Sequence, residues 1–338
     1  MGTCLPAGRF ERTTRIKVGA DAPAFCVSEL SASCYTTHYS LSAMPQVTRK
    51  PEHLHDKKLQ KLEELAMTVR RDIIAMLTEA GSGHSAGPLG MADIFTALYF
   101  HVMVHDPKKP DWADRDVLIL SNGHICPVRY VAMAHAGYGP KKEMMTLRKF
   151  GSRLQGHPER ERYPGVETTS GPLGSGPSIA AGMAYTFKYL DKKPNRVFVI
   201  TGDGELDAGV IWEAALFASR NRLHNLTWII DRNNIQIDGY TEDVMPIEPL
   251  VEKFKAFNFH VMEIDGHNIR EFVDAVEEGR AVWEKPSVII ARTIPGRGVD
   301  FMEFEPYWHG VPPKRGEEAE TSMAKLRTLD GLIRSEHE

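Results

Sequence analysis

Two short polar segments near the middle of the chain could bind a metal ion and an anion. The first is Gly202-Asp203-Gly204, and the second is Asp231-Arg232-Asn233-Asn234-Ile235. Glycines let a backbone approach an anion closely, and the carboxylate of Asp203 can bind a hard cation. An amide oxygen from Asn233 and a main-chain carbonyl after it would add neutral ligands, which leaves the rest of an octahedral Mg²⁺ shell to a diphosphate and water. Gly-Asp-Gly alone is usually a plain turn, so this prediction depends on the pair.

Four histidines stand next to glycines. They are His84, His124, His157 and His309. A histidine beside a glycine is usually a capped turn or a surface residue, so none of the four indicates a function when it is taken alone. Zinc is a competing interpretation, but no two of the four have the i, i+4 or short-loop spacing of mononuclear zinc sites. Cys126, near His124, is interpreted as a small buried residue rather than a nucleophile.

The two polar segments each follow an apolar run that is typical of a buried strand. These runs are residues 197–201 and 226–231, and a helical pattern over 210–222 lies between them. A strand–helix–strand unit requires a parallel sheet, so both segments should leave the same edge of it. Further strands are predicted at 117–120, 260–264 and 287–292, and further helices at 53–80, 90–102, 174–190 and 269–282. The predicted fold is α/β and doubly wound, with a mostly parallel sheet and helices on both faces.

One main domain, at residues 44–315, accounts for these elements in the 338-residue chain. Residues 1–43 hold three of the four cysteines and no pattern that could bury a face, so we expect a disordered extension. Met44 is an alternative start of translation. Residues 316–338 are predicted to form a polar C-terminal helix or tail.

Composition excludes several classes of function. The chain carries 41 Lys and Arg against 45 Asp and Glu, a formal net charge of −4, which provides no footprint for nucleic acid or an anionic membrane. No run approaches the roughly 18 apolar residues of a membrane span. The four cysteines have neither metal-ligand spacing nor the density of a disulfide scaffold, so we expect a reducing, cytoplasmic location. Small-molecule chemistry is the expected function.

The spacing of the two polar segments resembles the thiamine-diphosphate signature. Gly-Asp-Gly is followed by 28 residues and then by Asn-Asn. Among enzymes with this signature, the chain is similar to the N-terminal half of transketolase. Supporting segments occur in family order over about residues 55–315, at Gly83–Asp93, Leu120–His124, Gly156–Glu159, Gly171–Gly174 and Trp308–Gly310. The resemblance implies the thiamine-diphosphate-binding fold and its diphosphate-binding (PP) domain.

The resemblance also implies the roles of individual residues. Asp203, Asn233 and the carbonyl of Ile235 are implied to hold a divalent cation, Mg²⁺ or a substitute such as Ca²⁺ or Mn²⁺. Gly204 is implied to contact the diphosphate of the thiamine diphosphate cofactor. The other implied positions are His84, His124 and His309 along the diphosphate and the reacting sugar carbons, His157 at the substrate, and Gly171 and Leu173 at the thiazolium and aminopyrimidine rings.

Two departures from the family pattern bear on function. Transketolases usually carry a glutamate just before the glycine that opens the helix after Gly-Asp-Gly, and Ala208 occupies that position here. That glutamate belongs to a carboxylate network across the dimer interface, which Asp207 or Glu205 would have to supply instead. The catalytic glutamate of the family lies in a following pyrimidine-binding domain, whereas this chain ends about two dozen residues after the match.

The resemblance therefore implies the diphosphate-binding subunit of a split transketolase. Such an enzyme transfers a two-carbon ketol unit from a ketose or ketose phosphate to an aldose or aldose phosphate, as in pentose phosphate metabolism. Its partner is expected to be a separately encoded C-terminal, pyrimidine-domain subunit, in a heterotetramer. The alternatives are a transketolase specialised for an unusual sugar or sulfo-sugar, a dihydroxyacetone synthase, a relative of deoxyxylulose-phosphate synthase, and a non-catalytic thiamine-diphosphate-binding interaction protein.

Overall fold

Five parallel strands form the central sheet, in the order β1-β2-β3-β7-β6. The computed structural model describes residues 53–335 and 337, so the predicted extension at 1–43 and the alternative start at Met44 lie outside the described residues. The strands are β1 (Val117–Leu120), β2 (Val197–Gly202), β3 (Leu226–Arg232), β6 (His260–Asp265) and β7 (Ser287–Arg292). All five predicted strands are confirmed to within one residue at each end.

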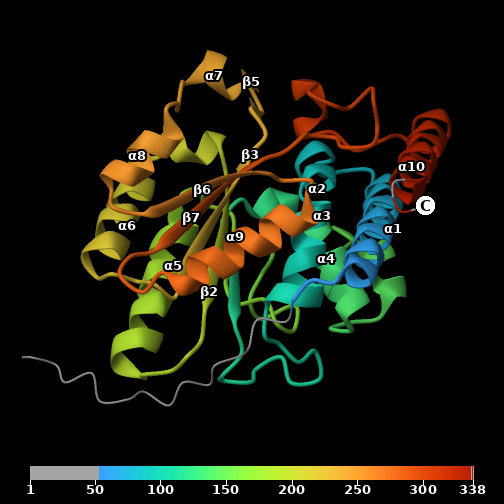
Figure 1. Ribbon diagram of the computed structural model, residues 1–338. Coiled ribbons are helices and arrows are strands. Elements are labelled where there is room, and N and C mark those ends of the chain that lie inside the picture. The colour runs from blue at the N-terminus through green and yellow to red at the C-terminus, as the bar shows by residue number, and fades with distance from the viewer. Residues whose placement is uncertain (1–52, 336, 338) are drawn as a thin grey trace, which may run out of the picture. The chain divides into compact units, whose positions relative to one another are not determined.

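Helices cover both faces of the sheet (Figure 1). One face packs against α5 (Ser175–Tyr185), α6 (Gly209–Arg220) and α8 (Leu250–Ala256). The other packs against α1 (Asp56–Ala80), α2 (Ala86–Gly90), α3 (Ala92–Ala97), α4 (Cys126–Ala136) and α9 (Ile269–Ala281). The last helix, α10 (Glu317–Ser335), lies against α1. The doubly wound α/β fold predicted from the sequence is confirmed. Among the helices described, none combines the length and the apolar character that crossing a bilayer requires.

The strands read as continuous apolar runs because both faces of the sheet are buried. Successive side chains of a strand point to opposite faces. In β2, Val197 and Val199 join the hydrophobic cluster under α5 and α6, whereas Phe198 and Ile200 join the cluster under α1 and α3. All of these side chains are fully buried. The sequence of the strand therefore shows a continuous apolar run and no alternation of apolar and polar residues.

Some helical segments differ from the sequence prediction. The predicted helix at 90–102 is divided into the end of α2, then α3, then a π-helical turn, η1 (Leu98–Val102). Gly90 lies at this break, where the backbone packs so closely on Ile294 that a Cβ would lie 3.0 Å from its carbonyl oxygen. The predicted helix at 174–190 is α5 followed by a second π-helical turn, η4 (Thr186–Leu190).

The sequence prediction also missed several elements. Helix α4 has no polar face, because every residue from Cys126 to Ala134 is buried, so it shows no amphipathic period. The short antiparallel hairpin of β4 (Ile235–Gln236) and β5 (Gly239–Tyr240) and the helices α7 (Thr241–Val244) and α8 are too short for a periodic signal. The same holds for the 3₁₀ turns η2 (Gly123–Ile125), η3 (Lys141–Thr146), η5 (Gly204–Asp207) and η6 (Pro306–His309).

The strand register determines which loops meet. Gly202, the last residue of β2, pairs with Asp231 of β3, and Leu120 of β1 pairs with Ile200 of β2. The residues that follow β1, β2 and β3 therefore leave the same edge of the sheet at nearly the same level. The sequence prediction that the two polar segments share this edge is confirmed.

Replacing Trp228 by alanine tests the core that holds this register. Trp228 is fully buried, its Nε1 donates to Thr201 Oγ1 at 2.9 Å, and its ring lies 5.4 Å from that of Phe254. We expect Trp228→Ala to lower the free energy of unfolding by about 3–5 kcal/mol in urea denaturation. Trp283→Ala is the matched control, since Trp283 is 58% exposed, and it should cost about 1 kcal/mol or less. Equal losses from the two substitutions would contradict this account of the core.

Candidate functional site

Asp203 is a buried carboxylate immediately after β2, and it joins the two polar segments. Its side chain is 1% exposed. Oδ1 accepts the backbone N–H of Gly204 at 2.7 Å and the Thr241 hydroxyl at 3.2 Å. Oδ2 accepts the backbone N–H of Asn234 at 2.6 Å and Nη1 of Arg232 at 2.8 Å. Burial raises the pKa of Asp203, and the charge of Arg232 and these hydrogen bonds oppose the rise.

The second segment bends back toward Asp203 directly after β3. Asn234 has a φ of +60°, in the left-handed region that asparagine tolerates, and this turn directs its N–H at Asp203. Asn233 is held on both sides, because its Oδ1 accepts the N–H of Ile235 at 2.9 Å and its Nδ2 donates to Oδ2 of Asp231 at 2.9 Å. The structure thus places Asn233 and Ile235 on either side of the Asn234 N–H that binds Asp203, and their role as cation ligands stays a prediction.

Asp231 lies behind this corner and orients Asn233. It is completely buried, and its other oxygen accepts the hydroxyl of Thr293. Burial raises the pKa of Asp231 to about 7, and the neighbouring charge of Asp203 acts in the same direction. The sequence analysis gave Asp231 no separate role, although its position at the end of a predicted strand marks it.

Glu205 connects three loops at the edge of the sheet. Its Oε1 accepts the hydroxyl of Ser121, after β1, at 2.5 Å and the N–H of Gly174 at 2.8 Å. Its Oε2 accepts the N–H of Gly202 at 3.1 Å. Because these bonds point Glu205 into its own chain, its carboxylate does not face outward as a substitute for the glutamate that Ala208 replaces. Asp207, in contrast, is exposed.

Three of the four predicted histidines form a cluster. His84 lies between α1 and α2, His124 in η2 after β1, and His309 at the end of η6. Their ring centroids are 4.8 Å apart for His84–His124, 5.2 Å for His124–His309 and 5.6 Å for His84–His309. Burial lowers the pKa of all three, that of His84 to about 4, so the imidazoles are neutral at pH 7.

His157 lies beside the cluster and is exposed. A Cβ built on Gly123 would lie 3.2 Å from Cδ2 of His157, which places His157 next to the loop of His124. Partial burial lowers the pKa of His157, as does the positive charge of Arg148. Arg148 has a φ of +59° and packs on Gly156, where an added Cβ would lie 2.6 Å from its Nε. Arg148 is a cation near the histidines that the sequence analysis did not identify.

The loop from Gly171 to Gly174 reaches the same edge of the sheet but remains exposed. Leu173 is 50% exposed, and nothing lies within 4 Å of a Cβ built on Gly171. Gly174, with a φ of +85°, is the N-cap of α5, and its N–H is bound by Glu205. Gly171 and Leu173 therefore present an open, partly apolar surface in the loop that Gly174 joins to Glu205.

Several buried polar atoms around this edge have no hydrogen-bond partner among the described residues. They are Nδ1 of His84, Nδ1 of His309, Oδ1 of Asn122 and Oγ of Ser170. A buried polar atom without a partner is costly, and native proteins rarely keep one unless a ligand or water satisfies it. Neither Asn122 nor Ser170 was assigned a role from the sequence, although Asn122 lies two residues after a predicted strand, within the segment Leu120–His124.

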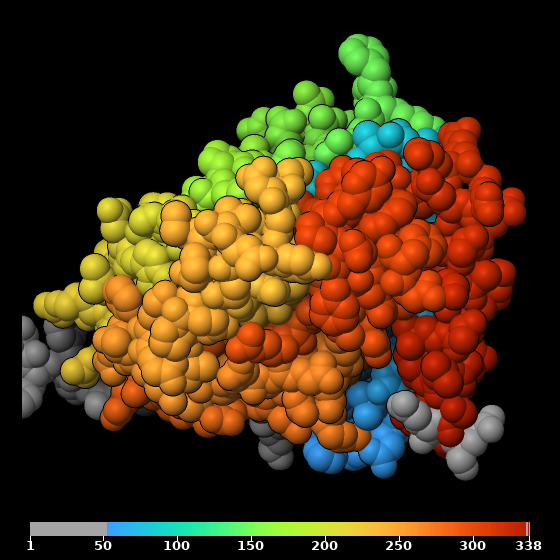
Figure 2. Space-filling model, turned by 90° about the horizontal axis from the view of Figure 1, so that it is seen from above, coloured from blue at the N-terminus to red at the C-terminus, as the bar shows by residue number. Residues whose placement is uncertain are grey.

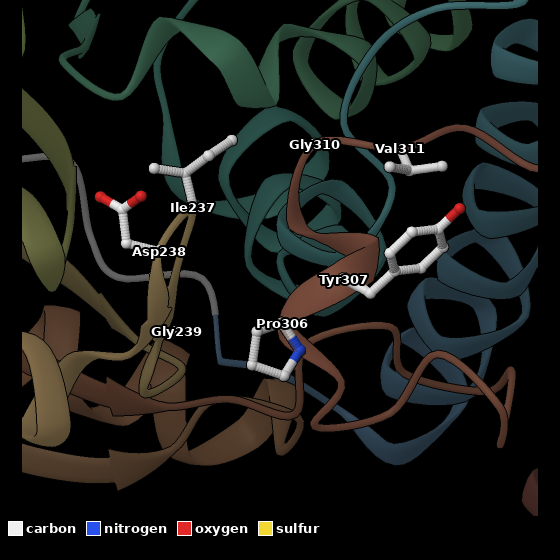
Figure 3. Close-up of a pocket in the computed structure, with 7 residues that line it drawn as sticks. All are labelled: Ile237, Asp238, Gly239, Pro306, Tyr307, Gly310 and Val311. Carbon is white, nitrogen blue, oxygen red and sulfur yellow. The ribbon is translucent and has the colours of Figure 1, made fainter.

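A pocket of about 340 Å³ opens beside the histidines (Figure 3). It lies between the turn of the β4–β5 hairpin, which carries Ile237 and Asp238, and η6, which carries Tyr307. Figure 2 shows these two segments, in gold and red, side by side on the face seen from above. A Cβ built on Gly310, which lines the pocket, would lie 3.7 Å from Nε2 of His84, so the pocket adjoins the cluster.

The donor set fits a hard cation bound together with a phosphorylated ligand. In the described part of the chain, no three His, Cys, Asp or Glu side chains are placed to hold a metal by themselves. The corner at Asp203 instead combines one carboxylate with the segment that carries the Asn233 amide and the Ile235 carbonyl, and these are the types of oxygen that Mg²⁺ takes when phosphate oxygens complete its shell. The unpartnered nitrogens of His84 and His309 fit a neighbouring polar ligand in the same way.

Comparisons with known proteins agree with this geometry. Residues 62–328 match the family model described as "Transketolase, thiamine diphosphate binding domain". The chain is 43% identical over 242 residues to the 6-deoxy-6-sulfo-D-fructose transketolase subunit SqwG of Clostridium sp. (strain MSTE9), covering 72% of this chain and 88% of that protein. It is 39% identical over 268 residues to one subunit of the apulose-4-phosphate transketolase of Actinobacillus succinogenes, covering 79% of this chain and 96% of that protein.

A solved structure shows the same fold. The transketolase of Campylobacter jejuni superposes with a TM-score of 0.74 at 34% identity, over 80% of this chain and 43% of that one. The resemblance inferred from the sequence is confirmed, since the matched residues contain both polar segments and all four histidines. The chain belongs to the transketolase family, and it contains that family's thiamine-diphosphate-binding domain.

Proposed function

We propose that this chain is the diphosphate-binding subunit of a two-subunit transketolase. It transfers a two-carbon ketol unit from a ketose to an aldose together with a separate pyrimidine-domain subunit. The observation that carries this proposal is the meeting of Asp203 with the Asn233–Ile235 segment beside three neutral histidines. The names of the two relatives support the division into subunits, because this chain covers 88% and 96% of proteins that are each named as a subunit.

In this proposal the corner at Asp203 holds a divalent cation, Mg²⁺ or Ca²⁺ or Mn²⁺ in its place. Asp203, the Oδ1 of Asn233 and the carbonyl of Ile235 are the protein ligands, and Gly204 lies against the diphosphate. A Cβ on Gly204 would lie only 3.2 Å from Cβ of Gln236. Glycine therefore fits at this crowded position and leaves its backbone accessible to the diphosphate. Gly171 and Leu173 contact the thiamine rings from the exposed loop before α5.

Bound thiamine diphosphate supplies a carbanion and an electron sink for carbon–carbon bond cleavage. The neutral imidazoles of His84, His124 and His309 accept protons from substrate hydroxyls and donate hydrogen bonds to substrate oxygens. Burial keeps these rings unprotonated at pH 7, which is the state that can accept a proton. His157, exposed at the outer side of the cluster, contacts the substrate.

Exposed apolar side chains on α5, η4 and α6 support the proposal that a partner subunit binds there. Large apolar side chains are exposed along these elements and along the adjoining loop: Leu173, Ile179, Tyr189, Leu190, Val210, Leu216 and Phe217. Apolar side chains gathered in this way mark interaction surfaces. This apolar surface begins at Leu173, so a partner that covers it also encloses the proposed cofactor site. We propose a two-plus-two heterotetramer in the cytoplasm.

The proposed substrates are sugars that carry an anionic group. The two relatives are named for a sulfonated sugar and for a sugar phosphate. Arg148 supports an anionic substrate, because its positive charge reaches both His84 and His157. Ketoses and aldoses of pentose phosphate metabolism are the general candidates within this class.

Removing the Asp203 carboxylate tests the proposed cation site. We expect Asp203→Ala to abolish the Mg²⁺-dependent binding of thiamine diphosphate, measured by isothermal titration calorimetry in the presence of the partner subunit. Asp243→Ala removes the same charge from an exposed position on α7 and serves as the control, with binding unchanged. Undiminished Mg²⁺-dependent binding to the Asp203 variant would rule out this site.

Reconstitution tests the division into two subunits. The chain alone should show no ketol transfer above background, and adding the pyrimidine-domain subunit should restore it, because the carboxylate that activates the cofactor comes from the partner. The assay follows formation of the product ketose from a ketose phosphate donor and an aldose phosphate acceptor. Full turnover by the isolated chain would show that no second subunit is needed.

The buried histidines predict a loss of stability in acid. The pKa of His84 is about 4 in the folded chain, whereas a histidine in an unfolded chain titrates near 6.5. The unfolded chain therefore binds the proton first, so the unfolding free energy falls as the pH drops from about 6.5 to about 4. We measure the free energy of unfolding in urea across this pH window. His84→Asn should lose less of it on acidification than the wild type does. His53→Asn, at an exposed position, is the control and should show the same loss as the wild type. The idea fails if His84→Asn follows the wild-type curve.

A further inference from the structure

Arg232 is a buried arginine at the proposed cation site. It is the last residue of β3, and its side chain is 3% exposed. Its guanidinium reaches three carboxylates: Nη1 lies 2.8 Å from Oδ2 of Asp203, Nη2 lies 2.6 Å from Oε1 of Glu242, and Nε lies 3.1 Å from Oε1 of Glu248. Nη1 also donates to Oδ1 of Asn234 at 3.2 Å. A positive charge thus lies against the one carboxylate that would bind the metal.

The carboxylate of Asp203 is fully occupied by protein donors. An ionised carboxylate has about four lone-pair positions, and Asp203 fills them with Gly204 N–H, Asn234 N–H, the Thr241 hydroxyl and Arg232. A cation bound at Asp203 must therefore take a position that one of these donors holds. The two N–H groups are fixed by the backbone, and the Thr241 hydroxyl is uncharged. Only Arg232 both competes for an oxygen and repels a divalent cation.

The Arg232 guanidinium and the three carboxylates that it contacts carry a net charge of −2. A divalent cation bound at Asp203 would neutralise this charge. The exposed pair of Arg292 with Glu263 adjoins Glu248 and leaves this net charge unchanged. Glu242 and Glu248 are also placed to keep the guanidinium if it leaves Asp203, since they already contact its other two nitrogens, Nη2 and Nε.

We propose that Arg232 is the internal counter-ion of Asp203, which holds this carboxylate in the absence of metal and weakens divalent cation binding by competing for it. On cation binding, the guanidinium gives up Asp203 and remains paired with Glu242 and Glu248. The side chain is thus a positioning residue that sets cation affinity. This inference rests on the proposed function, because it takes Asp203 as a metal ligand.

The test measures binding of Mn²⁺ to the full chain in complex with the partner subunit and saturating thiamine diphosphate, with the free ion followed by electron paramagnetic resonance. Arg232→Gln keeps a hydrogen-bonding side chain and removes the charge, and it should bind Mn²⁺ about tenfold more tightly than the wild type. Arg232→Lys keeps the charge and should remain within a few-fold of the wild type. Arg292→Gln is the matched control, because Arg292 contacts Glu248 but not Asp203, and its affinity should not change.

Thermal unfolding without metal provides a second readout. In EDTA, Arg232→Gln should melt at a lower temperature than the wild type, and saturating Mn²⁺ with thiamine diphosphate should raise its melting temperature by more. If Arg232→Gln does not fold, Glu242→Gln decides the question, since removing this carboxylate strengthens the hold of Arg232 on Asp203 and should weaken Mn²⁺ binding.

Unchanged or weaker Mn²⁺ binding by folded Arg232→Gln would overturn the inference, as would unchanged binding by Glu242→Gln. A wild-type complex with the partner subunit that binds no Mn²⁺ with thiamine diphosphate would instead contradict the proposed cation site itself. The two failures are therefore distinguishable.

Discussion

The parallel pairing of β2 with β3 is the constraint on which the site depends. Because Gly202 pairs with Asp231, the chain leaves both strands at the same level, and Asp203 meets the N–H of Asn234 at 2.6 Å. Two segments separated by 26 residues in the sequence thereby form one polar corner. The buried hydrophobic clusters on both faces of the sheet hold this register. The geometry of the corner therefore depends on side-chain packing away from the polar residues themselves.

Polar groups at this edge are buried in two different ways. Asp203 and Glu205 are fully hydrogen-bonded within the chain, and Glu205 fixes the loops after β1 and β2 and before α5 relative to one another. The histidines lack such partners on Nδ1 of His84 and His309, and their rings are held neutral by burial. The carboxylates therefore build the site, whereas the imidazoles remain available to a ligand.

Much of the fold and the polar corner could be predicted from the sequence, because apolar runs mark strands and parallel strands end together. The strands after which Asp203 and Asn233 stand were located to within one residue. Helix α4 could not be predicted in this way, since it is buried on all sides and shows no period. The inward direction of Glu205 and the contact of Arg232 with Asp203 are side-chain arrangements that no spacing reveals. The gathering of His84, His124 and His309 followed only from the family resemblance, because their loops are distant in the sequence.

The central claim is that two loops at one sheet edge hold a single cation and the diphosphate bound to it. The most direct test is a crystal structure of the complex with the partner subunit, grown with Mn²⁺ and thiamine diphosphate, with data collected to locate manganese by anomalous scattering. This account predicts one strong anomalous peak bonded to Asp203, Asn233 and the carbonyl of Ile235, with diphosphate oxygens completing the shell. A cofactor bound elsewhere, or a peak away from Asp203, would contradict it.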